Sequence, residues 1–161
     1  MMVNAVLGPP APAEATPTED AGLPVRKVVL IDPREERRAI TSRLIDRCPD
    51  LEVVGLAGDL LEAQTQIEAA GADVAILEIQ LPVSEGLAAI AALRSRFPTL
   101  RIVVCSFHSD ATTRDEARSL GADGYLTKPL QIHDLLPLVI EPAPVSPVPE
   151  ATAPRAVGRA W

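Results

Sequence analysis

The chain has 161 residues, a formal net charge of −7 at pH 7, two cysteines and only 2% aromatic residues. This length allows one ordinary domain, and the acidic balance argues against sequence-independent binding to nucleic acid. Two cysteines are too few for a disulfide framework. Charges or prolines interrupt every apolar run before the roughly 20 residues that a membrane-spanning helix needs. We therefore expect a cytoplasmic protein with an aliphatic core and no insertion into a membrane.

Both ends of the chain have a composition that predicts disorder. Residues 1–24 and 141–161 are rich in proline and alanine and lack the period of a helix or a strand. Such segments cannot bury enough apolar surface to offset the entropy of the chain. We expect a disordered N-terminal tail over 1–24, one domain over 25–140 and a disordered C-terminal tail over 141–161.

Between the tails, short apolar runs alternate with segments of helical pattern. The apolar runs predict five strands, over residues 28–31, 51–57, 74–77, 101–105 and 124–127. The intervening pattern predicts five helices, over residues 35–48, 60–70, 84 or 85 to 96, 111–120 after a cap at Asp110, and 131–140. Strands that alternate with helices form a parallel sheet covered on both faces. This count favours a flavodoxin-like, doubly wound α/β fold with strand order 2-1-3-4-5.

The first predicted helix has an apolar stripe. Ile40, Leu44 and Ile45 share one side of it and are expected to face the core. The simplest interpretation of its arginines is a solvated outer face, formed by Arg37, Arg38, Arg43 and Arg47. In the last predicted helix, an internal proline at position 137 is expected to kink or shorten the helix.

Polar side chains follow the strands that lie at the centre of this predicted sheet. In the order 2-1-3-4-5 the chain reverses its winding between strands one and three, and such sheets bind ligands at the carboxyl ends of those strands. Asp32 follows the first strand and Glu78 the third. The fourth and fifth strands add Ser106 and Lys128. The sequence therefore predicts one polar site at this edge, while Cys105, which precedes Ser106, is expected to lie in the core.

Residues 25–140 resemble the receiver domains of bacterial two-component response regulators, the CheY-like superfamily. One part of the resemblance is the run Asp73-Val-Ala-Ile-Leu-Glu78, followed by Leu-Pro at 81–82 and by Gly86. Another is the pair Lys128-Pro129. The segments 48–55 and 121–126 are most similar to receivers of regulators that end in a helix-turn-helix.

The resemblance implies a role for each residue of the predicted site. Glu78 stands at the position of the phosphoacceptor, which in the family is an aspartate that forms an acyl phosphate. Asp32 corresponds to one residue of an acidic pair that binds Mg²⁺. Lys128 corresponds to the lysine that neutralises the phosphoryl group. Ser106 and Tyr125 correspond to the hydroxyl and aromatic residues whose coupled movement carries the signal to partners.

Two positions depart from the family pattern. Glu78 extends its carboxylate about 1.5 Å further than aspartate would, and a displacement near 1 Å can cost about a hundredfold in rate. Pro33 stands where the second acid of the metal-binding pair belongs. Glu35 and Glu36 are the candidates to replace that acid, although acids favour the first turn of a helix in any case. Any Mg²⁺ site at Asp32 is therefore expected to be weak or vestigial.

These observations favour a stand-alone atypical receiver that is not an enzyme. We expect it to act through contacts with a protein, a sensor kinase or a downstream signalling protein, without normal aspartyl phosphorylation. The 21 residues from Glu141 onward are too few for an output domain. The alternative is a working phosphoacceptor receiver in a histidine-kinase phosphorelay. Whether Glu78 and Lys128 imitate the activated state or form a merely structural ion pair stays open. A small-ligand binder of flavodoxin type is remote, because no glycine-rich loop follows the first strand.

Overall fold

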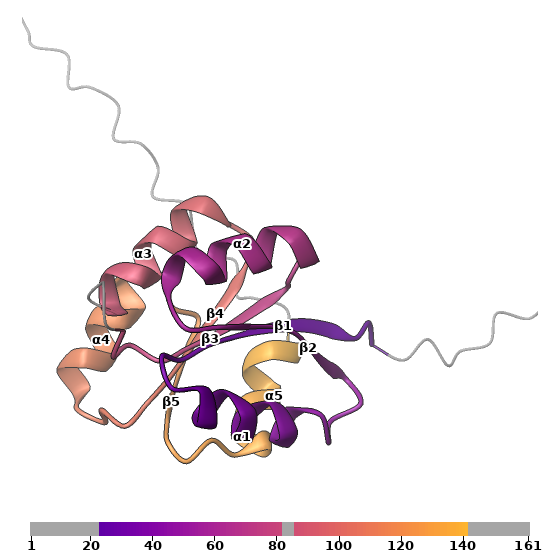
Figure 1. The fold of residues 1–161 in the computed structure, drawn as a ribbon. Helices are drawn as coiled ribbons and strands as arrows, with labels where there is room; N and C mark the ends of the chain where they lie inside the picture. Colours follow the sequence, from indigo (N-terminus) through magenta and orange to yellow (C-terminus); the bar gives the residue numbers. More distant parts are fainter. Residues whose placement is uncertain (1–22, 82–85, 142–161) are drawn as a thin grey trace, which may run out of the picture.

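The computed structural model describes residues 23–81 and 86–141 (Figure 1). The predicted tails, 1–24 and 141–161, lie almost entirely outside these residues. The predicted start of the third helix at Ser84 or Glu85 also lies outside them. In the two described ranges, no helix is long and apolar enough to cross a membrane.

Five parallel strands form one sheet in the predicted order, β2-β1-β3-β4-β5. Their bounds are β1 Arg26–Ile31, β2 Leu51–Ala57, β3 Val74–Leu77, β4 Arg101–Ser106 and β5 Gly124–Thr127. In the sheet, Ile31 pairs with Leu77, and Leu77 pairs with Val104. The residues that follow β1 and β3 therefore leave the sheet side by side, which brings the predicted site together.

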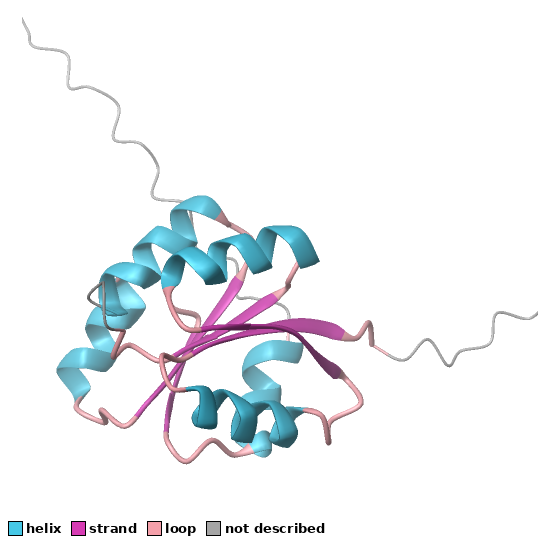
Figure 2. Ribbon diagram, viewed as in Figure 1, coloured by secondary structure: helices cyan, strands magenta, loops and turns pink. Residues whose placement is uncertain are grey.

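Helices cover both faces of this sheet (Figure 2). Their bounds are α1 Glu35–Ile45, α2 Leu60–Ala70, α3 Gly86–Arg96, α4 Ala111–Ser119 and α5 Ile132–Ile140. Asp59 caps α2 by accepting a hydrogen bond from the amide of Glu62, and Asp110 caps α4 by accepting one from the amide of Thr113. Figure 1 shows α1 and α5 on one face of the sheet and α2 and α3 on the other.

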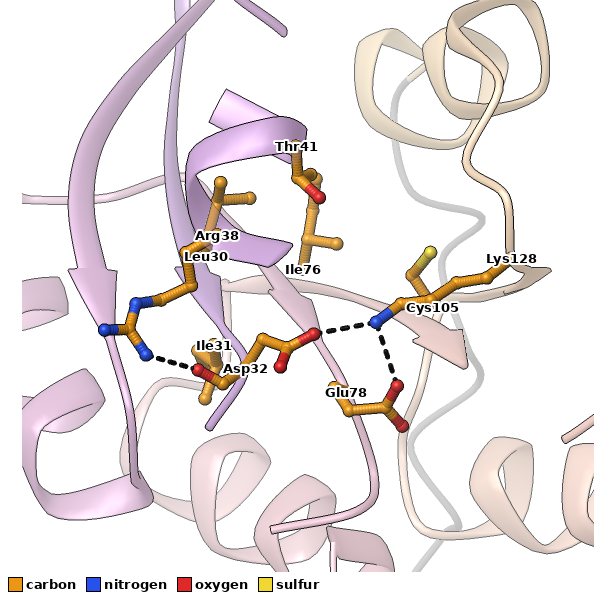
Figure 3. Close-up of a pocket in the computed structure, with 9 residues that line it drawn as sticks. All are labelled: Leu30, Ile31, Asp32, Arg38, Thr41, Ile76, Glu78, Cys105 and Lys128. Carbon is orange, nitrogen blue, oxygen red and sulfur yellow. Dashed lines mark hydrogen bonds and ion pairs between the residues drawn. The ribbon is translucent and has the colours of Figure 1, made fainter. Parts of the chain in front are cut away.

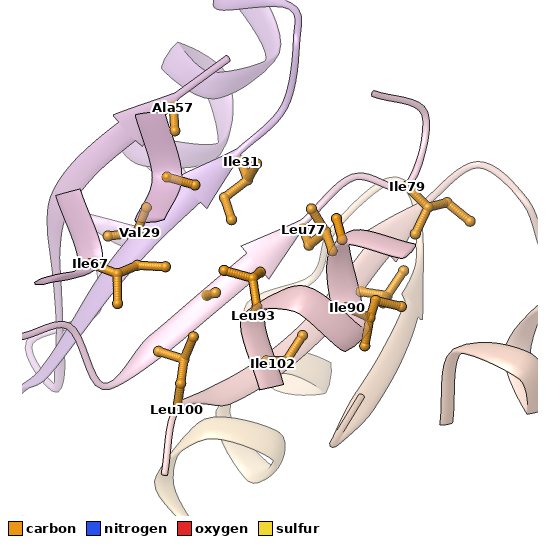
Figure 4. Packing of buried hydrophobic residues seen from close by; sticks show 14 of the residues in the cluster. Val29, Ile31, Ala57, Ile67, Leu77, Ile79, Ile90, Leu93, Leu100 and Ile102 are labelled. Carbon is orange, nitrogen blue, oxygen red and sulfur yellow. The ribbon is translucent and has the colours of Figure 1, made fainter. Parts of the chain in front are cut away.

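Each face of the sheet carries its own aliphatic core. Neighbouring side chains of a strand point to opposite faces, so Val29 and Ile31 pack in one cluster while Val28 and Leu30 pack in the other. The first cluster joins the sheet to α2, α3 and α4, and Figure 4 shows its packing. The second joins the sheet to α1 and α5 and includes Cys105, as predicted for that residue. A doubly wound α/β fold is thus confirmed.

The prediction for the apolar stripe of α1 was wrong. Ile40 is 68% exposed, Leu44 is half-buried, and only Ile45 of the predicted stripe is buried. The side of α1 that faces the sheet instead carries Arg38 and Thr41, which line a small cavity beneath the site. These two residues share a helix face with Ile45 at spacings of three and four. The hydrogen bond from Arg38 to the backbone carbonyl of Asp32 turns this face of α1 toward the sheet. Ile40 therefore lies at the side of the helix.

The side chain of Arg94 joins three segments at the opposite end of the sheet. Its guanidinium donates hydrogen bonds to the carbonyl oxygens of Gly121, Pro98 and Leu100, at 2.8–3.1 Å. It also pairs with the carboxylate of Asp123 at 2.6 Å. This one side chain therefore holds the end of α3, the start of β4 and the turn before β5 together.

Replacement of Arg94 by alanine should lower the free energy of unfolding by about 2–3 kcal/mol, because several charge-assisted hydrogen bonds disappear together. Arg96, in the same helix, offers a matched control. It pairs with Glu68 at the surface, where both side chains are at least half exposed, so its replacement by alanine should cost less than about 1 kcal/mol. Urea denaturation of both variants measures the difference in the free energy of unfolding. Equal losses would contradict the conclusion that Arg94 holds three segments of the fold together.

Candidate functional site

The structure brings four of the five predicted site residues into contact at the carboxyl edge of the sheet (Figure 3 draws three of them). Asp32 and Glu78 come directly after β1 and β3, Ser106 ends β4, and Lys128 follows β5. Backbone hydrogen bonds continue the sheet past these strand ends. The amide of Glu78 donates to the carbonyl of Ile31 at 2.8 Å, and the amide of Lys128 donates to that of Ser106 at 2.9 Å. The side chains are therefore positioned by rigid strands.

The carboxylate of Glu78 is almost completely buried, since the residue is 2% exposed. Its Oε1 accepts a hydrogen bond from the hydroxyl of Ser106 at 2.7 Å and another from the amide of Gln80 at 3.1 Å. Its Oε2 lies 2.9 Å from Nζ of Lys128. That approach lacks the angles of a good hydrogen bond, but the attraction of the two charges depends mainly on their distance. Both oxygen atoms of Glu78 are thus engaged within the protein.

Lys128 is shared between two carboxylates. Its Nζ lies 2.7 Å from Oδ2 of Asp32 as well as 2.9 Å from Oε2 of Glu78 (Figure 3). All three side chains are largely buried, with exposed fractions of 13%, 10% and 1% for Lys128, Asp32 and Glu78. A buried charge is costly without a partner, so this arrangement satisfies the lysine and both acids together.

Two arginines of α1 contribute to the site, contrary to the prediction that they face solvent. The guanidinium of Arg38 donates a hydrogen bond to the backbone carbonyl of Asp32 at 2.6 Å. Nη1 of Arg37 lies 4.0 Å from Oε2 of Glu78. Arg37 thereby adds a second positive charge beside a lysine that already faces two negative ones. The helical spacing alone could not identify these residues, because their partners lie on other elements.

Phe107 forms an exposed cover beside this charged cluster. Its ring is 57% exposed, with the guanidinium carbon of Arg37 4.9 Å and Nζ of Lys128 5.3 Å from the ring centroid. Such distances allow cation–π attraction. The sequence analysis did not identify Phe107 as a site residue. The signal that could have identified it is its position directly after Ser106, at the end of a strand that leads into the site.

Tyr125, the fifth predicted residue, does not contact Glu78 directly. Its hydroxyl donates a hydrogen bond to the backbone carbonyl of His108 at 2.8 Å, and the amide of His108 donates to the hydroxyl oxygen of Ser106 at 3.3 Å. Partial burial raises the pKa of Tyr125, with a further contribution from the negative charge of Asp110. The loop after β4 therefore links the aromatic ring to the serine that holds Glu78.

Cys105 lies beside the site but shows no sign of reactivity. Burial raises the pKa of its thiol to about 11, and the nearby positive charge of Lys128 offsets only part of this effect. A thiol with such a pKa stays protonated near neutral pH and is a poor nucleophile. Cys105 is therefore a packing residue.

The described residues do not fit a Mg²⁺ site. Mg²⁺ is usually bound through one or two carboxylates together with several waters, so the fit depends on whether the carboxylates of Asp32 and Glu78 are free to face a metal ion. The ammonium group of Lys128 lies between the carboxylates of Asp32 and Glu78. Pro33 offers no side-chain ligand, and Glu35 and Glu36 are exposed on α1. In this arrangement the ammonium group of Lys128 neutralises the two acids.

Comparison with known proteins identifies the family. The model of the response regulator receiver domain matches residues 28–140. The chain belongs to the response regulator receiver family. In agreement, the receiver domain of the putative response regulator NarL from Mycobacterium tuberculosis superimposes with a TM-score of 0.66 at 28% identity, over 72% of this chain and 94% of that one. The protein thus contains a CheY-like receiver domain of two-component signalling.

Two relatives from Mycobacterium tuberculosis are similar in sequence. The DNA-binding transcriptional activator DevR/DosR is 39% identical over 106 residues, which cover 65% of this chain and 48% of that protein. The transcriptional regulatory protein PdtaR is 34% identical over 125 residues, which cover 76% of this chain and 60% of that protein. The chain therefore spans less than two thirds of the length of either relative, and the similarity to them concerns the receiver.

Proposed function

We propose that this receiver signals through protein–protein contacts and without phosphorylation of an aspartate. The observation that carries the proposal is the state of Glu78, which occupies the acceptor position with Oε1 hydrogen-bonded to Ser106 and Gln80 and Oε2 paired with the charge of Lys128. A nucleophile must present a free oxygen in line with the incoming phosphoryl group. Glu78 instead directs its oxygens to Ser106, Gln80 and Lys128.

The surrounding residues support the same proposal. Lys128, which in the family neutralises the phosphoryl group, is shared here by two carboxylates of the protein. Ser106 is turned toward Glu78 and donates to it at 2.7 Å, so the negative charge that a phosphoryl group would bring is partly supplied by the glutamate itself. The imitation is partial, because a carboxylate carries one charge and a phosphoryl group nearly two.

The partner in this proposal is a protein, either a sensor kinase or a downstream signalling protein. The domain performs no catalysis of its own and needs neither nucleic acid nor a membrane, and it acts in the cytoplasm. Any Mg²⁺ binding is weak, because Asp32 lacks a second acid at position 33. The fixed ion pairs give the partner one conformation to recognise.

The decisive experiment is the intact mass of the protein after incubation with acetyl phosphate and Mg²⁺. Three proteins are compared: the wild type, Glu78→Asp, and the double variant Pro33→Asp/Glu78→Asp, which restores both the acceptor and the acidic pair. We expect no phosphoryl group on the wild type and one on the double variant, because only the latter has the residues that the family uses. The single variant Glu78→Asp shows whether the residue at position 78 alone prevents phosphorylation.

Two results would overturn the proposal. One is a wild-type protein that gains a phosphoryl group and loses this ability in Glu78→Ala, which would identify a working phosphoacceptor in a histidine-kinase phosphorelay. The other is tight, saturable binding of beryllofluoride to the wild type, measured by calorimetry in the presence of Mg²⁺. The double variant could also stay unmodified although its circular dichroism spectrum matches that of the wild type. This result would show that residues other than those at positions 33 and 78 also prevent phosphorylation.

A further inference from the structure

An apolar groove runs along α1 on the face that this helix shares with α5. Its first part, with a volume of about 260 Å³, is bordered by Ile40 and Phe107. Its second part, of about 580 Å³, lies between the end of α1 and the start of α5 and is bordered by Ile132 and Leu136. Leu44 lines both parts, so the two adjoin along α1.

This groove combines exposed apolar side chains with positive charge. Ile40 is 68% exposed and Phe107 is 57% exposed, and contiguous exposed apolar surface marks an interaction site. Arg37 and Arg47 border the groove at its two ends, and Asp50 is its single acidic lining residue. A basic border is unexpected on a chain of net charge −7. An acidic segment with some apolar side chains would complement this surface in charge and polarity.

The first 22 residues of the chain have this chemistry. They contain three acidic residues, Glu14, Glu19 and Asp20, and no basic one. Val6 and Leu7 supply apolar side chains in the same segment. Its four prolines each fix one backbone angle, and a segment with less freedom loses less entropy when it binds.

The point at which the chain enters the described part of the fold lies beside the groove. The amide of Arg26, at the start of β1, donates to the carbonyl of Asp50 at 2.9 Å, and Asp50 borders the second part of the groove. Figure 1 shows the start of β1 at the same edge as the turn between α1 and β2. An extended segment of 22 residues can span about 70 Å, whereas α1, with 11 residues, is only about 16 Å long. Residues 1–22 can therefore reach the whole groove.

We infer that residues 1–22 bind in the groove between α1 and α5 of the same molecule, with their acidic side chains against Arg37 and Arg47. Tethering raises the effective concentration of the segment to about the millimolar range, so weak contacts suffice. In this arrangement the segment lies against the exposed side chains of Ile40 and Phe107, which border the groove. The C-terminal residues 142–161 are a poorer match, because Glu150 is balanced there by two arginines.

The test compares amide chemical shifts of the ¹⁵N-labelled full chain, wild type against the triple variant Glu14→Gln/Glu19→Gln/Asp20→Asn. All three changes precede the described range that begins at residue 23, so the described fold keeps its own sequence. We expect the groove amides of Ile40 and Leu44 to shift several-fold more than amides of α2 on the opposite face. Addition of NaCl to about 0.5 M should reproduce the shifts in the wild type, because salt screens exposed charges.

A second pair of variants tests the groove itself. Ile40→Asn should change the amide shifts of Val6 and Leu7, whereas Leu61→Asn, at a residue of α2 that is 75% exposed, should leave them unchanged. Shifts that stop at residues 23–26 would overturn the inference, because they would show no contact with the groove. Shifts that depend on protein concentration would show a second copy as the occupant, and shifts that follow Glu150→Gln would show the C-terminal segment. Neither readout depends on phosphorylation, so the outcome is independent of the function proposed above.

Discussion

Replacement of Lys128 by methionine should lower the free energy of unfolding by about 3–5 kcal/mol, the usual cost of removing one partner from a buried ion pair. Methionine keeps most of the length of the side chain but removes its charge. Asp32 and Glu78, which are 7% and 2% exposed, would then face each other as two buried anions. Arg37, at 4.0 Å from Glu78, would be the nearest remaining cation. Guanidinium or urea denaturation at neutral pH measures the loss.

Two further variants separate this electrostatic effect from general damage. The double variant Lys128→Met/Glu78→Gln should be more stable than Lys128→Met alone, since one of the two unneutralised anions has been removed. Lys27 is the only other lysine of the chain. Among the described residues, its side chain makes one long, exposed hydrogen bond, from Nζ to the carbonyl of Ala70 at 3.4 Å. Lys27→Met should therefore cost less than about 1 kcal/mol. A Lys128→Met protein as stable as Lys27→Met would show that the shared ion pair adds nothing to the fold.

Replacement of Gly86 by alanine should lower the free energy of unfolding by about 3 kcal/mol or more, because overpacking against backbone cannot be relieved by a rotamer change. Gly86 is the first residue of α3 and is buried. A Cβ atom there would overlap the backbone carbonyl group of Ile79. Ile79 lies between Glu78 and Gln80, so a displacement of this backbone would also disturb the hydrogen bond that holds the carboxylate.

Gly71 provides the matched comparison for this substitution. It ends α2 in the left-handed conformation, with φ of 61°, and a Cβ atom there would meet nothing within 4 Å. Gly71→Ala should therefore cost only about 1–2 kcal/mol, the strain of a left-handed alanine. Urea denaturation of Gly86→Ala and Gly71→Ala compares the loss of stability from overpacking with the loss from left-handed strain. An equal or larger loss at Gly71 would contradict the close approach of α3 to the end of β3.

The fold could be predicted from the sequence because each of its signals is local. The apolar run before Glu78 gives a buried strand, Asp59 and Asp110 precede helices that they cap, and Gly71 stops α2. A parallel sheet of this order then brings the residues after its strands to one edge, so Asp32, Glu78, Ser106 and Lys128 could be assigned to one place from the strands and the family resemblance. None of these inferences needs a contact between distant side chains.

The residues that were missed depend on such distant contacts. Ile40 fits an apolar stripe, yet the side of α1 that faces the sheet is set by the hydrogen bond of Arg38 to the carbonyl of Asp32, which no helical period encodes. The prediction that Arg37 faces solvent was wrong for the same reason, since its partner Glu78 follows a strand some forty residues later. Phe107 was missed because the two cations beside its ring, Arg37 and Lys128, come from other parts of the chain.

The sharing of Lys128 between Asp32 and Glu78 has a consequence for how a cell would use the proposed function. An ordinary switch is turned on and off while the number of molecules stays constant. Here the ammonium group that would respond to an arriving phosphoryl group is held by two carboxylates of the chain itself. Under the proposed function the strength of the signal would follow the number of molecules present, so synthesis and degradation of the protein would set its output.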